Sequence, residues 1–160
     1  MASRPRQLTR AYRSTSPRYP LLDGGGAYRW GSRWCSPGRW VVHGAETYAL
    51  AVLENLVHWR TNALPPSLVC VEIDIPRELK QEHLDPAKLS GRNELDYLVS
   101  RAAGDDWYDR GACAVLWVPS VISPYECNVL FNRTHPDFAR VRIGKPRPAG
   151  FDPRLWRNPS

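Results

Sequence analysis

The amino-acid sequence predicts an α+β fold, in which a single domain combines mixed or antiparallel sheet with flanking helices. The chain of 160 residues is long enough for one sizeable hydrophobic core and too short for two. Hydrophobic residues make up 42% of it and include seven tryptophans, which indicates a packed interior. Short strand-like runs mix with two helical patterns, and this order favours the α+β class. We therefore expect one domain over residues 1–160, with a core over residues 8–155 and basic ends.

Five runs predict strands because they are rich in aliphatic, β-branched and aromatic residues and are bounded by turn residues. They are residues 8–13, 40–44, 68–75, 112–118 and 126–132. The third run alternates between apolar and polar residues, as a half-buried strand does, whereas the fourth is continuously apolar and suits a central strand. A loop rich in Ser, Pro and Gly is expected after the first strand, through Gly26.

Two stretches predict helices. Residues 46–60 contain strong helix formers and neither Gly nor Pro. The apolar residues that form a stripe at helical spacing along this stretch are Leu50, Leu53 and Val57. A second helix is expected over residues 93–103, ending near Gly104.

The net charge of +6 is unevenly distributed along the chain. Residues 1–40 hold eight arginines against one acid, and residues 139–160 hold six basic residues against one acid. The stretch between them is acidic overall. Three explanations are open: binding of nucleic acid through its phosphates, capture of a small phosphorylated ligand, or a pair of solvated tails. Charge alone favours the tails.

The sequence offers no sign of export, membrane insertion or a metal centre. The arginines near the N-terminus are not followed by an apolar run, so we expect neither a signal peptide nor a membrane span and predict a cytoplasmic protein. The cysteines are too far apart for a paired C-x-x-C metal site and are expected to be reduced thiols. They are Cys35, Cys70, Cys113 and Cys127.

Glu54 is a candidate functional residue because of its place on the first predicted helix. At 100° per residue it lies about 40° from Leu50 and about 60° from Val57, so it borders the apolar stripe. A half-buried carboxylate needs a cation or hydrogen bonds, and His58, one turn further along, could supply one. The alternative is a glutamate at the helix edge whose carboxylate reaches water.

Arg33 is a second candidate because it lies in a loop between Gly31 and Gly38. Tryptophans that could form apolar walls around it are Trp30, Trp34 and Trp40. A guanidinium in such surroundings binds phosphate or carboxylate with two parallel hydrogen bonds. The alternative is an arginine stacked on tryptophan for packing alone.

Three weaker candidates lie at the ends of predicted strands. Ser120 follows the apolar run at 112–118, but a Pro-Ser turn is common and a structural role is favoured for it. His43 ends the strand before the first helix and could be a base, a stacking surface or a core residue. Arg13 ends the first strand, and an ordinary solvated arginine is favoured there. The sequence contains no G-x-S-x-G, H-E-x-x-H or Walker motif.

Two longer stretches resemble the signature of the RES-domain family. GSRWCSPGRWVVHGAETYALAVLENLVHW is similar to that family's G-G-R-W-N-x-x-G, V-V-Y and A-L-A-x-L-E series. VPSVISPYECNVLFNRTHPDF is similar to its P-S strand end and E-x-N-V-L-x-N-x-x-H-P-D-F block. Ordered matches of this kind cover most of residues 10–155.

This resemblance implies a fold like that of ADP-ribosyltransferases and a toxin of a toxin–antitoxin pair that degrades NAD or transfers its ADP-ribose. The namesake catalytic triad then corresponds to Arg33, Glu54 and Ser120. The residues expected to bind NAD are Arg13, Arg33, His43, Glu54, His58 and Ser120. The implied partner is a cognate Xre-type helix-turn-helix antitoxin in an oligomeric complex, with no membrane, metal or direct nucleic-acid contact. NAD is then a substrate.

Two positions depart from the family pattern. His43 stands where the family usually has tyrosine, and Cys35 stands where it usually has asparagine. The acceptor of ADP-ribose is not identified by the sequence: water, inorganic phosphate and a protein side chain all remain open. Inorganic phosphate is the preferred co-substrate because an arginine-rich site can accommodate a second anion.

Two alternatives from other classes also remain. A nucleic-acid binder would use the basic ends and exposed tryptophans, and its binding would survive Glu54→Ala. A catalytically weak relative, disabled by His43 and Cys35, would still bind an Xre-type partner but leave NAD intact.

Overall fold

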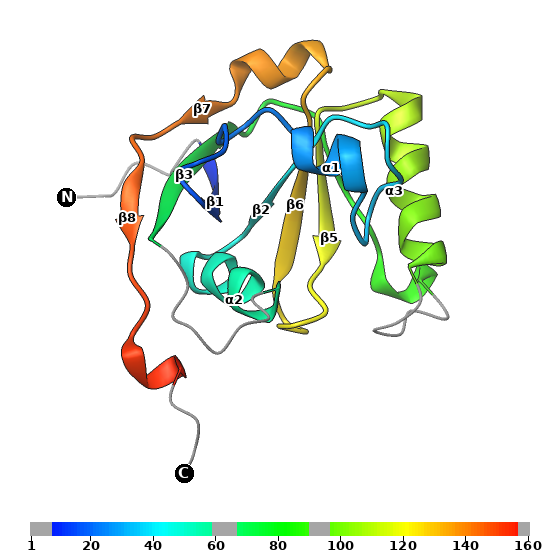
Figure 1. The fold of residues 1–160 in the computed structure, drawn as a ribbon. Coiled ribbons are helices and arrows are strands. Elements are labelled where there is room, and N and C mark those ends of the chain that lie inside the picture. Colours follow the sequence, from blue (N-terminus) through cyan, green and yellow to red (C-terminus); the bar gives the residue numbers. More distant parts are fainter. Residues whose placement is uncertain (1–7, 59–66, 90–96, 157–160) are drawn as a thin grey trace, which may run out of the picture.

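The computed structural model describes residues 8–58, 67–89 and 97–156, and Figure 1 shows how their elements are arranged. Within these ranges, eight strands form one sheet in the order β4-β5-β6-β2-β1-β3-β7, with β8 paired to β3. β4 and β5 run parallel, and the other neighbouring strands run antiparallel. The predicted α+β class with a mixed sheet is confirmed.

The strands are β1 (Leu8–Thr15), β2 (Val41–Ala45), β3 (Leu68–Pro76), β4 (Gln81–His83), β5 (Val115–Pro119), β6 (Cys127–Asn132), β7 (Arg142–Ile143) and β8 (Arg147–Ala149). The α-helices are α1 (Gly25–Trp30), α2 (Tyr48–His58) and α3 (Leu98–Arg110), and 3₁₀ turns occupy Pro86–Lys88, Pro136–Arg140 and Pro153–Trp156. None of the helices in these described ranges is long and apolar enough to cross a bilayer.

The five predicted strands are present as β1, β2, β3, β5 and β6, with ends shifted by three residues or fewer. The alternation expected in β3 is visible in its buried Val71, Ile73 and Ile75. Sequence patterns missed α1, where a loop was expected, and the strands β4, β7 and β8. Each of these elements has six residues or fewer, which is too short for a hydrophobic period to be recognised.

Apolar side chains cover both faces of the central strands, because successive residues of a strand point to opposite sides. Val42 of β2 and Phe131 of β6 lie in one cluster with the apolar residues of β1 and β3. Their neighbours Val41 and Leu130 lie in a second cluster, which includes Trp107 of α3. Helix α3 therefore covers one face of β2, β5 and β6, beside β5 in Figure 1.

Helix α3 does not end near Gly104, so that prediction is wrong. The helix continues to Arg110, and the residue that ends it is Gly111, with φ 57°. Gly104 lies inside the helix, and this position requires glycine because a side chain there would overlap the carbonyl oxygen of Trp34. The glycine serves a close approach between helix and loop rather than a helix end. Residues 93–96 of the predicted helix lie outside the described residues.

Helix α2 confirms the first predicted helix, although it is shorter than residues 46–60. Thr47 precedes its first residue, and Oγ of Thr47 accepts a hydrogen bond from the backbone N–H of Leu50 at 3.1 Å. This contact satisfies one of the free N–H groups at the start of a helix. Residues 59–60 of the prediction lie outside the described part of the chain.

The buried face of α2 differs from the predicted stripe. Leu53 and Val57 are 38% and 58% exposed, whereas Ala51 is buried. Asn55, one turn after Ala51, donates a hydrogen bond from Nδ2 to the carbonyl oxygen of Ser14 in β1 at 2.9 Å. Leu50, the first residue of the predicted stripe, is fully buried, whereas a small residue and an amide face β1 in place of Leu53 and Val57.

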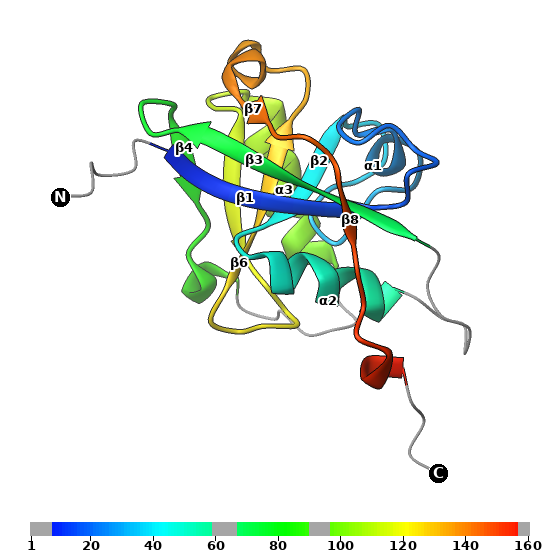
Figure 2. The same ribbon diagram turned by 90° about the vertical axis from the view of Figure 1, so that its left-hand side faces the viewer.

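The sheet bends sharply between β1 and β2. In the described residues these strands share a single pair, Tyr12 with Ala45, whereas β1 and β3 pair along the whole of β1. Figure 2 shows β1 and β3 crossing the direction of β5 and β6. Gly44 permits the contact at the bend, since a Cβ there would lie 3.0 Å from the carbonyl oxygen of Tyr12. The strands diverge beyond this point and leave room between them.

Candidate active site

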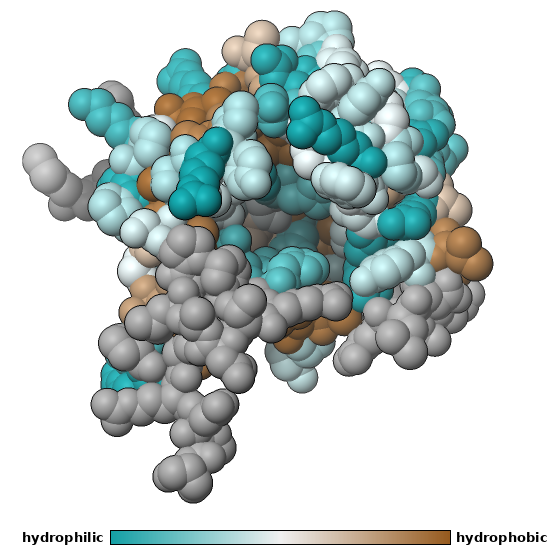
Figure 3. All heavy atoms as spheres, in the orientation of Figure 1, coloured by the Kyte–Doolittle hydropathy of each residue, from teal (hydrophilic) through white to brown (hydrophobic). Residues whose placement is uncertain are grey.

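A pocket of about 1130 Å³ opens where β1 and β2 diverge. Its lining comes from these strands, α2, β6, the loop after α1, the start of α3 and the loop after β5. Figure 3 shows the hollow on the face drawn in Figure 1, with hydrophilic residues inside it and along its upper and right-hand rim. The pocket brings together five of the six predicted site residues: Arg13, Arg33, His43, Glu54 and His58. Its volume is sufficient for a nucleotide-sized ligand.

Glu54 is half-buried on the side of α2 that faces the pocket. Its Oε1 accepts a hydrogen bond from Nδ2 of Asn128, in β6, at 2.7 Å. The hydrogen bond expected from His58 therefore comes from Asn128 instead, while His58 is exposed and lines the same pocket. The carboxylate is fixed in position by a neutral amide, which leaves its negative charge uncompensated by that contact.

Asn128 holds Glu54 at a cost in stability, because its own Oδ1 is buried and has no hydrogen-bond partner among the described residues. We expect Asn128→Ala to lower the turnover of a reaction that uses Glu54 about tenfold, since the carboxylate loses its positioning contact. The free energy of unfolding should change by only about 1 kcal/mol, because the lost hydrogen bond and the removed buried oxygen offset each other. Steady-state kinetics and urea unfolding measure the two effects.

Asn132 provides a matched control on the same strand, outside the pocket. Its Oδ1 accepts hydrogen bonds from the backbone N–H and Oγ1 of Thr134 at 3.0 and 2.7 Å. Asn132→Ala should lower stability and leave turnover per folded molecule unchanged. Equal losses of turnover in the two variants would show that Asn128 acts only through the packing of β6.

Arg13 joins the two strands across the bend. Its Nε donates to the carbonyl oxygen of Leu21 at 2.6 Å, and its Nη1 donates to that of His43 at 2.7 Å. The guanidinium thus donates to the His43 carbonyl of β2, which lies beyond the single backbone pair between β1 and β2. Burial lowers the pKa of Arg13 below its usual range. The expectation of an ordinary solvated arginine is wrong.

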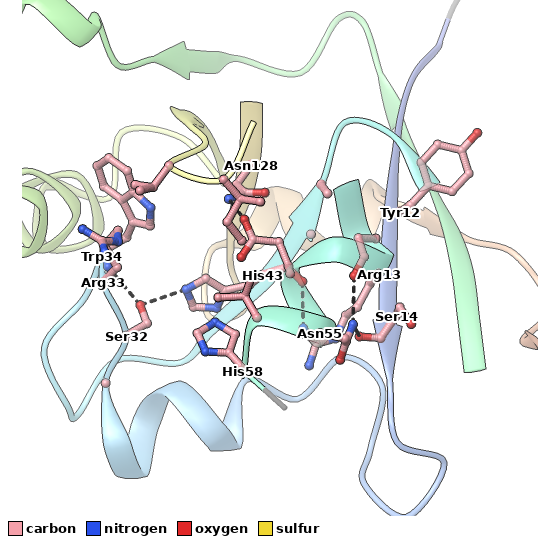
Figure 4. A pocket seen from close by; sticks show the side chains of 18 of the residues that line it. Tyr12, Arg13, Ser14, Ser32, Arg33, Trp34, His43, Asn55, His58 and Asn128 are labelled. Carbon is pink, nitrogen blue, oxygen red and sulfur yellow. Dashed lines mark hydrogen bonds between the residues drawn. The ribbon is translucent and has the colours of Figure 1, made fainter. Parts of the chain in front are cut away.

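His43 belongs to a chain of polar contacts at the pocket floor, which Figure 4 shows in part. Its Nε2 lies 2.9 Å from Oγ of Ser32, and that oxygen lies 3.2 Å from Sγ of Cys35. The two positions that depart from the family pattern are thus linked through one serine. Burial and the charge of Arg13 lower the pKa of His43 from 6.5 to about 4. The imidazole is neutral at physiological pH.

The lowered pKa of His43 has a measurable effect on stability. Between pH 6.5 and 4 the unfolded chain binds a proton at this residue and the folded protein does not, so stability falls as pH is lowered through this window. We expect wild type to lose about 1–3 kcal/mol there relative to His43→Gln, whose side chain does not titrate. Urea unfolding of both proteins at several pH values gives this difference. A difference that stays constant with pH would contradict the neutral imidazole.

The loop that carries Arg33 begins at Gly31, whose backbone conformation strongly favours glycine. Gly31 has φ 67°, in the left-handed region, and a Cβ there would lie 2.8 Å from the carbonyl oxygen of Cys35. Trp34, directly after Arg33, is 3% exposed and packs in the cluster against α3. The arginine therefore extends from a backbone that is anchored on both sides.

Helix α3 fixes the same loop through its first three turns. Nε of Arg101 donates to the carbonyl oxygen of Ser32 at 2.7 Å. Asp105 accepts hydrogen bonds from the backbone N–H and Oγ of Ser36 at 2.8 and 2.6 Å. Between these two contacts lies Gly104, against which the loop backbone rests. The position of the loop depends on a helix almost seventy residues later in the chain.

The aromatic surroundings of Arg33 differ from those expected. Its guanidinium carbon lies 4.5 Å from the centroid of the Tyr97 ring. Trp30 is 80% exposed, and Trp40 stacks on Tyr28 with 4.3 Å between ring centroids, away from the pocket lining. The prediction that these two tryptophans form walls around Arg33 is wrong. Tyr97 provides the aromatic contact.

Ser120 lies at the end of β5 and is 1% exposed. Its Oγ accepts hydrogen bonds from the backbone N–H groups of Ile122 and Ser123 at 3.2 and 3.0 Å. Val121 and Ile122 line the pocket, whereas the buried Ser120 is not part of the lining. The serine shapes the loop that forms part of the wall, and a direct contact with a ligand stays a prediction.

Among the pocket residues that the sequence did not predict are Asn128, Tyr97 and Arg101. Asn128 stands inside the ECNVLFN run, so a polar side chain within a predicted strand was an available signal. Tyr97 and Arg101 lie in no motif. Among the residues that the structure describes, no group of three or more His, Cys, Asp or Glu could hold a metal ion. The site instead gathers a carboxylate, a neutral imidazole and several guanidinium groups.

Comparison with known proteins identifies the family. A family model described as "RES domain" matches residues 7–152. The chain belongs to the RES domain family. A protein of Sphingobium sp. (strain YBL2) named "Prs ADP-ribosylating toxin" is 37% identical over 140 residues, covering 85% of this chain and 87% of the relative. A "Toxin Res" of Photorhabdus laumondii is 32% identical over 148 residues, covering 90% and 95%.

The fold of this RES domain has a solved counterpart. The structure titled "Crystal structure of the M.tuberculosis MbcT-MbcA toxin-antitoxin complex" contains a chain that superposes with a TM-score of 0.71. The match covers 93% of this chain and 87% of that one, at 18% sequence identity. The likeness establishes a shared fold. The resemblance to RES domains expected from the sequence is confirmed.

Proposed function

We propose that this RES domain is a toxin that cleaves the bond between nicotinamide and ribose in NAD and transfers the ADP-ribose group. The observation that carries the proposal is the half-buried carboxylate of Glu54, which Asn128 fixes inside a pocket that also contains arginines. The relatives named as toxins, one of them ADP-ribosylating, support it. NAD is the substrate in this proposal, and no metal takes part.

The reaction requires a negative charge beside the ribose. As the bond to nicotinamide breaks, positive charge develops on the sugar, much as it does in glycoside hydrolysis. Glu54 stabilises that charge where it appears, and its fixed position means that little reorganisation is needed. Nicotinamide leaves as a neutral molecule with the bonding electrons.

The other pocket residues bind the two ends of NAD. Arg33 contacts the pyrophosphate, and the charge of Arg13 adds to the attraction for this anion. The neutral ring of His43 faces the nicotinamide, whose positive charge an imidazolium would repel. His58 contacts NAD one turn from Glu54. Ser120 positions the nicotinamide ribose through the loop that it shapes.

Inorganic phosphate is the proposed acceptor of ADP-ribose, which makes the protein an NAD phosphorylase, and water is the competing acceptor. Three arginines in one pocket provide charge for both the pyrophosphate and a second anion. A protein side chain is the second candidate acceptor. The 37% identity to a protein named as an ADP-ribosylating toxin favours it.

We further propose that an Xre-type helix-turn-helix antitoxin binds this domain in an oligomeric complex in the cytoplasm. Support comes from the shared fold with a toxin crystallised in a toxin–antitoxin complex. An antitoxin that covers the pocket would block NAD access.

The test is purified protein incubated with NAD, with and without inorganic phosphate, and with products separated by chromatography. Release of nicotinamide in both reactions, with phosphorylated ADP-ribose only when phosphate is present, supports the phosphorylase. Nicotinamide release that needs an added protein, which becomes labelled, supports the transferase. NAD that stays intact under all conditions would contradict cleavage and leave the antitoxin-binding role of a catalytically weak relative.

A further inference from the structure

We infer that Arg101, together with Arg33 and the Tyr97 ring, forms an oxyanion subsite of the pocket that takes a phosphate or pyrophosphate group. No motif in the sequence includes Arg101. The inference rests on the proposed function and adds a residue and a ligand chemistry to it.

Both guanidinium groups lie against one aromatic ring. The guanidinium carbons of Arg33 and Arg101 are 4.5 and 5.4 Å from the centroid of Tyr97. All three residues line the pocket, and Arg101 is half-buried there. The ring attracts both cations through its face, and it also brings two like charges close together. A phosphate group bound beside the ring would be attracted by both guanidinium groups.

Arg101 differs from the paired arginines around α3. Arg110, on the same helix, bonds Glu82 and Asp106, and Arg39 bonds Asp105 and Asp109 on that helix. Within the described residues, no ion pair joins Arg101 to a carboxylate, and its hydrogen bond runs from Nε to a carbonyl oxygen. A cation that is buried in part and lacks an acid is suited to a ligand that brings its own negative charge.

The remaining donors of Arg101 are arranged for an anion. The contact of Nε with the Ser32 carbonyl fixes the plane of the guanidinium and leaves Nη1 and Nη2 as donors. Two parallel N–H groups match two oxygens of a phosphate. Arg13, in contrast, already donates hydrogen bonds from both Nε and Nη1 to backbone carbonyl oxygens. Arg101 is therefore the better equipped second guanidinium beside Arg33.

The phosphate group could belong to NAD or to the acceptor, and one experiment distinguishes them. We compare wild type, Arg101→Gln and Arg110→Gln, a control with the same loss of charge on the same helix outside the pocket. Calorimetry measures binding of ADP-ribose, and kinetics give KM for NAD and for inorganic phosphate. A pyrophosphate subsite weakens ADP-ribose binding and raises KM for NAD about tenfold in Arg101→Gln alone. A subsite for the acceptor raises only KM for phosphate.

The remaining outcomes are also decisive. Constants in Arg101→Gln within twofold of wild type, or equal losses in Arg110→Gln, would overturn the subsite. If Arg101→Gln does not fold, Arg101→Lys takes its place, because lysine keeps the charge but lacks the two parallel donors. Inorganic pyrophosphate should raise the melting temperature of Arg101→Lys less than that of wild type. An equal rise in both would also overturn the subsite. Wild type that releases no nicotinamide but binds ADP-ribose about tenfold more tightly than Arg101→Gln supports the subsite and rejects the proposed function.

Discussion

Glu54→Gln is expected to lower the rate of nicotinamide release from NAD by about 10²–10³-fold, a loss typical of removing one electrostatic group from a transition state. Glutamine keeps the shape of the side chain and still offers an oxygen to Nδ2 of Asn128, so the fold and NAD binding should persist. The substitution removes the negative charge that stabilises the positive charge developing on the ribose in the transition state. The loss should therefore fall on kcat and leave the dissociation constant for NAD almost unchanged.

Single-turnover measurement of nicotinamide release, with NAD binding determined by calorimetry, tests this expectation. Glu78→Gln is the matched control, because Glu78 is an exposed carboxylate paired with Arg140 away from the pocket. It should be as active as wild type. Turnover in Glu54→Gln within threefold of wild type would remove the carboxylate from the mechanism, whatever the reaction proves to be.

Gly104→Ala should have the largest effect on stability. A methyl group at this position cannot coexist with the carbonyl oxygen of Trp34, so either the loop of residues 31–39 or helix α3 must move. Overpacking of this kind costs about 1–3 kcal/mol, and contact with a backbone atom favours the upper end. Arg33 and Arg101 lie on the two sides of this contact, so the anion-binding part of the pocket is distorted as well.

Urea unfolding and NAD turnover in the same preparation measure both consequences. Gly26→Ala, in α1, is the control because a Cβ there meets no atom within 4 Å and the helical position favours alanine. It should be as stable as wild type or slightly more so. A Gly104→Ala protein with wild-type stability and turnover would mean that the loop does not depend on its close approach to α3.

The parts of the fold that the sequence predicted are those specified by local patterns. β3 alternates, β5 is continuously apolar and α2 contains only helix-compatible residues, so each was recognisable within its own segment. The end of α3 was not, because Gly104 has the local appearance of a helix stop. Its actual role depends on Trp34, seventy residues earlier, and no local pattern carries that information.

The same distinction between local patterns and long-range contacts applies to the candidate site. Arg33 and Glu54 stood out through residue type and through ordered motifs, and His43 through its place at the end of a predicted strand; the structure gathers all three in one pocket. The contacts that hold them could not be predicted, since Asn128 reaches Glu54 from a strand 74 residues later and Arg101 reaches the Ser32 carbonyl across 69 residues. Motifs identify groups that carry charge, and tertiary contacts determine what holds them in place.

The contact chain from His43 through Ser32 to Cys35 has a consequence for how such a domain diverges. His43 and Cys35 both contact the hydroxyl of Ser32, so a new residue at one of these three positions changes the hydrogen-bond partners available to the other two. Tyrosine alone at position 43 would remove the imidazole nitrogen that now contacts Oγ of Ser32.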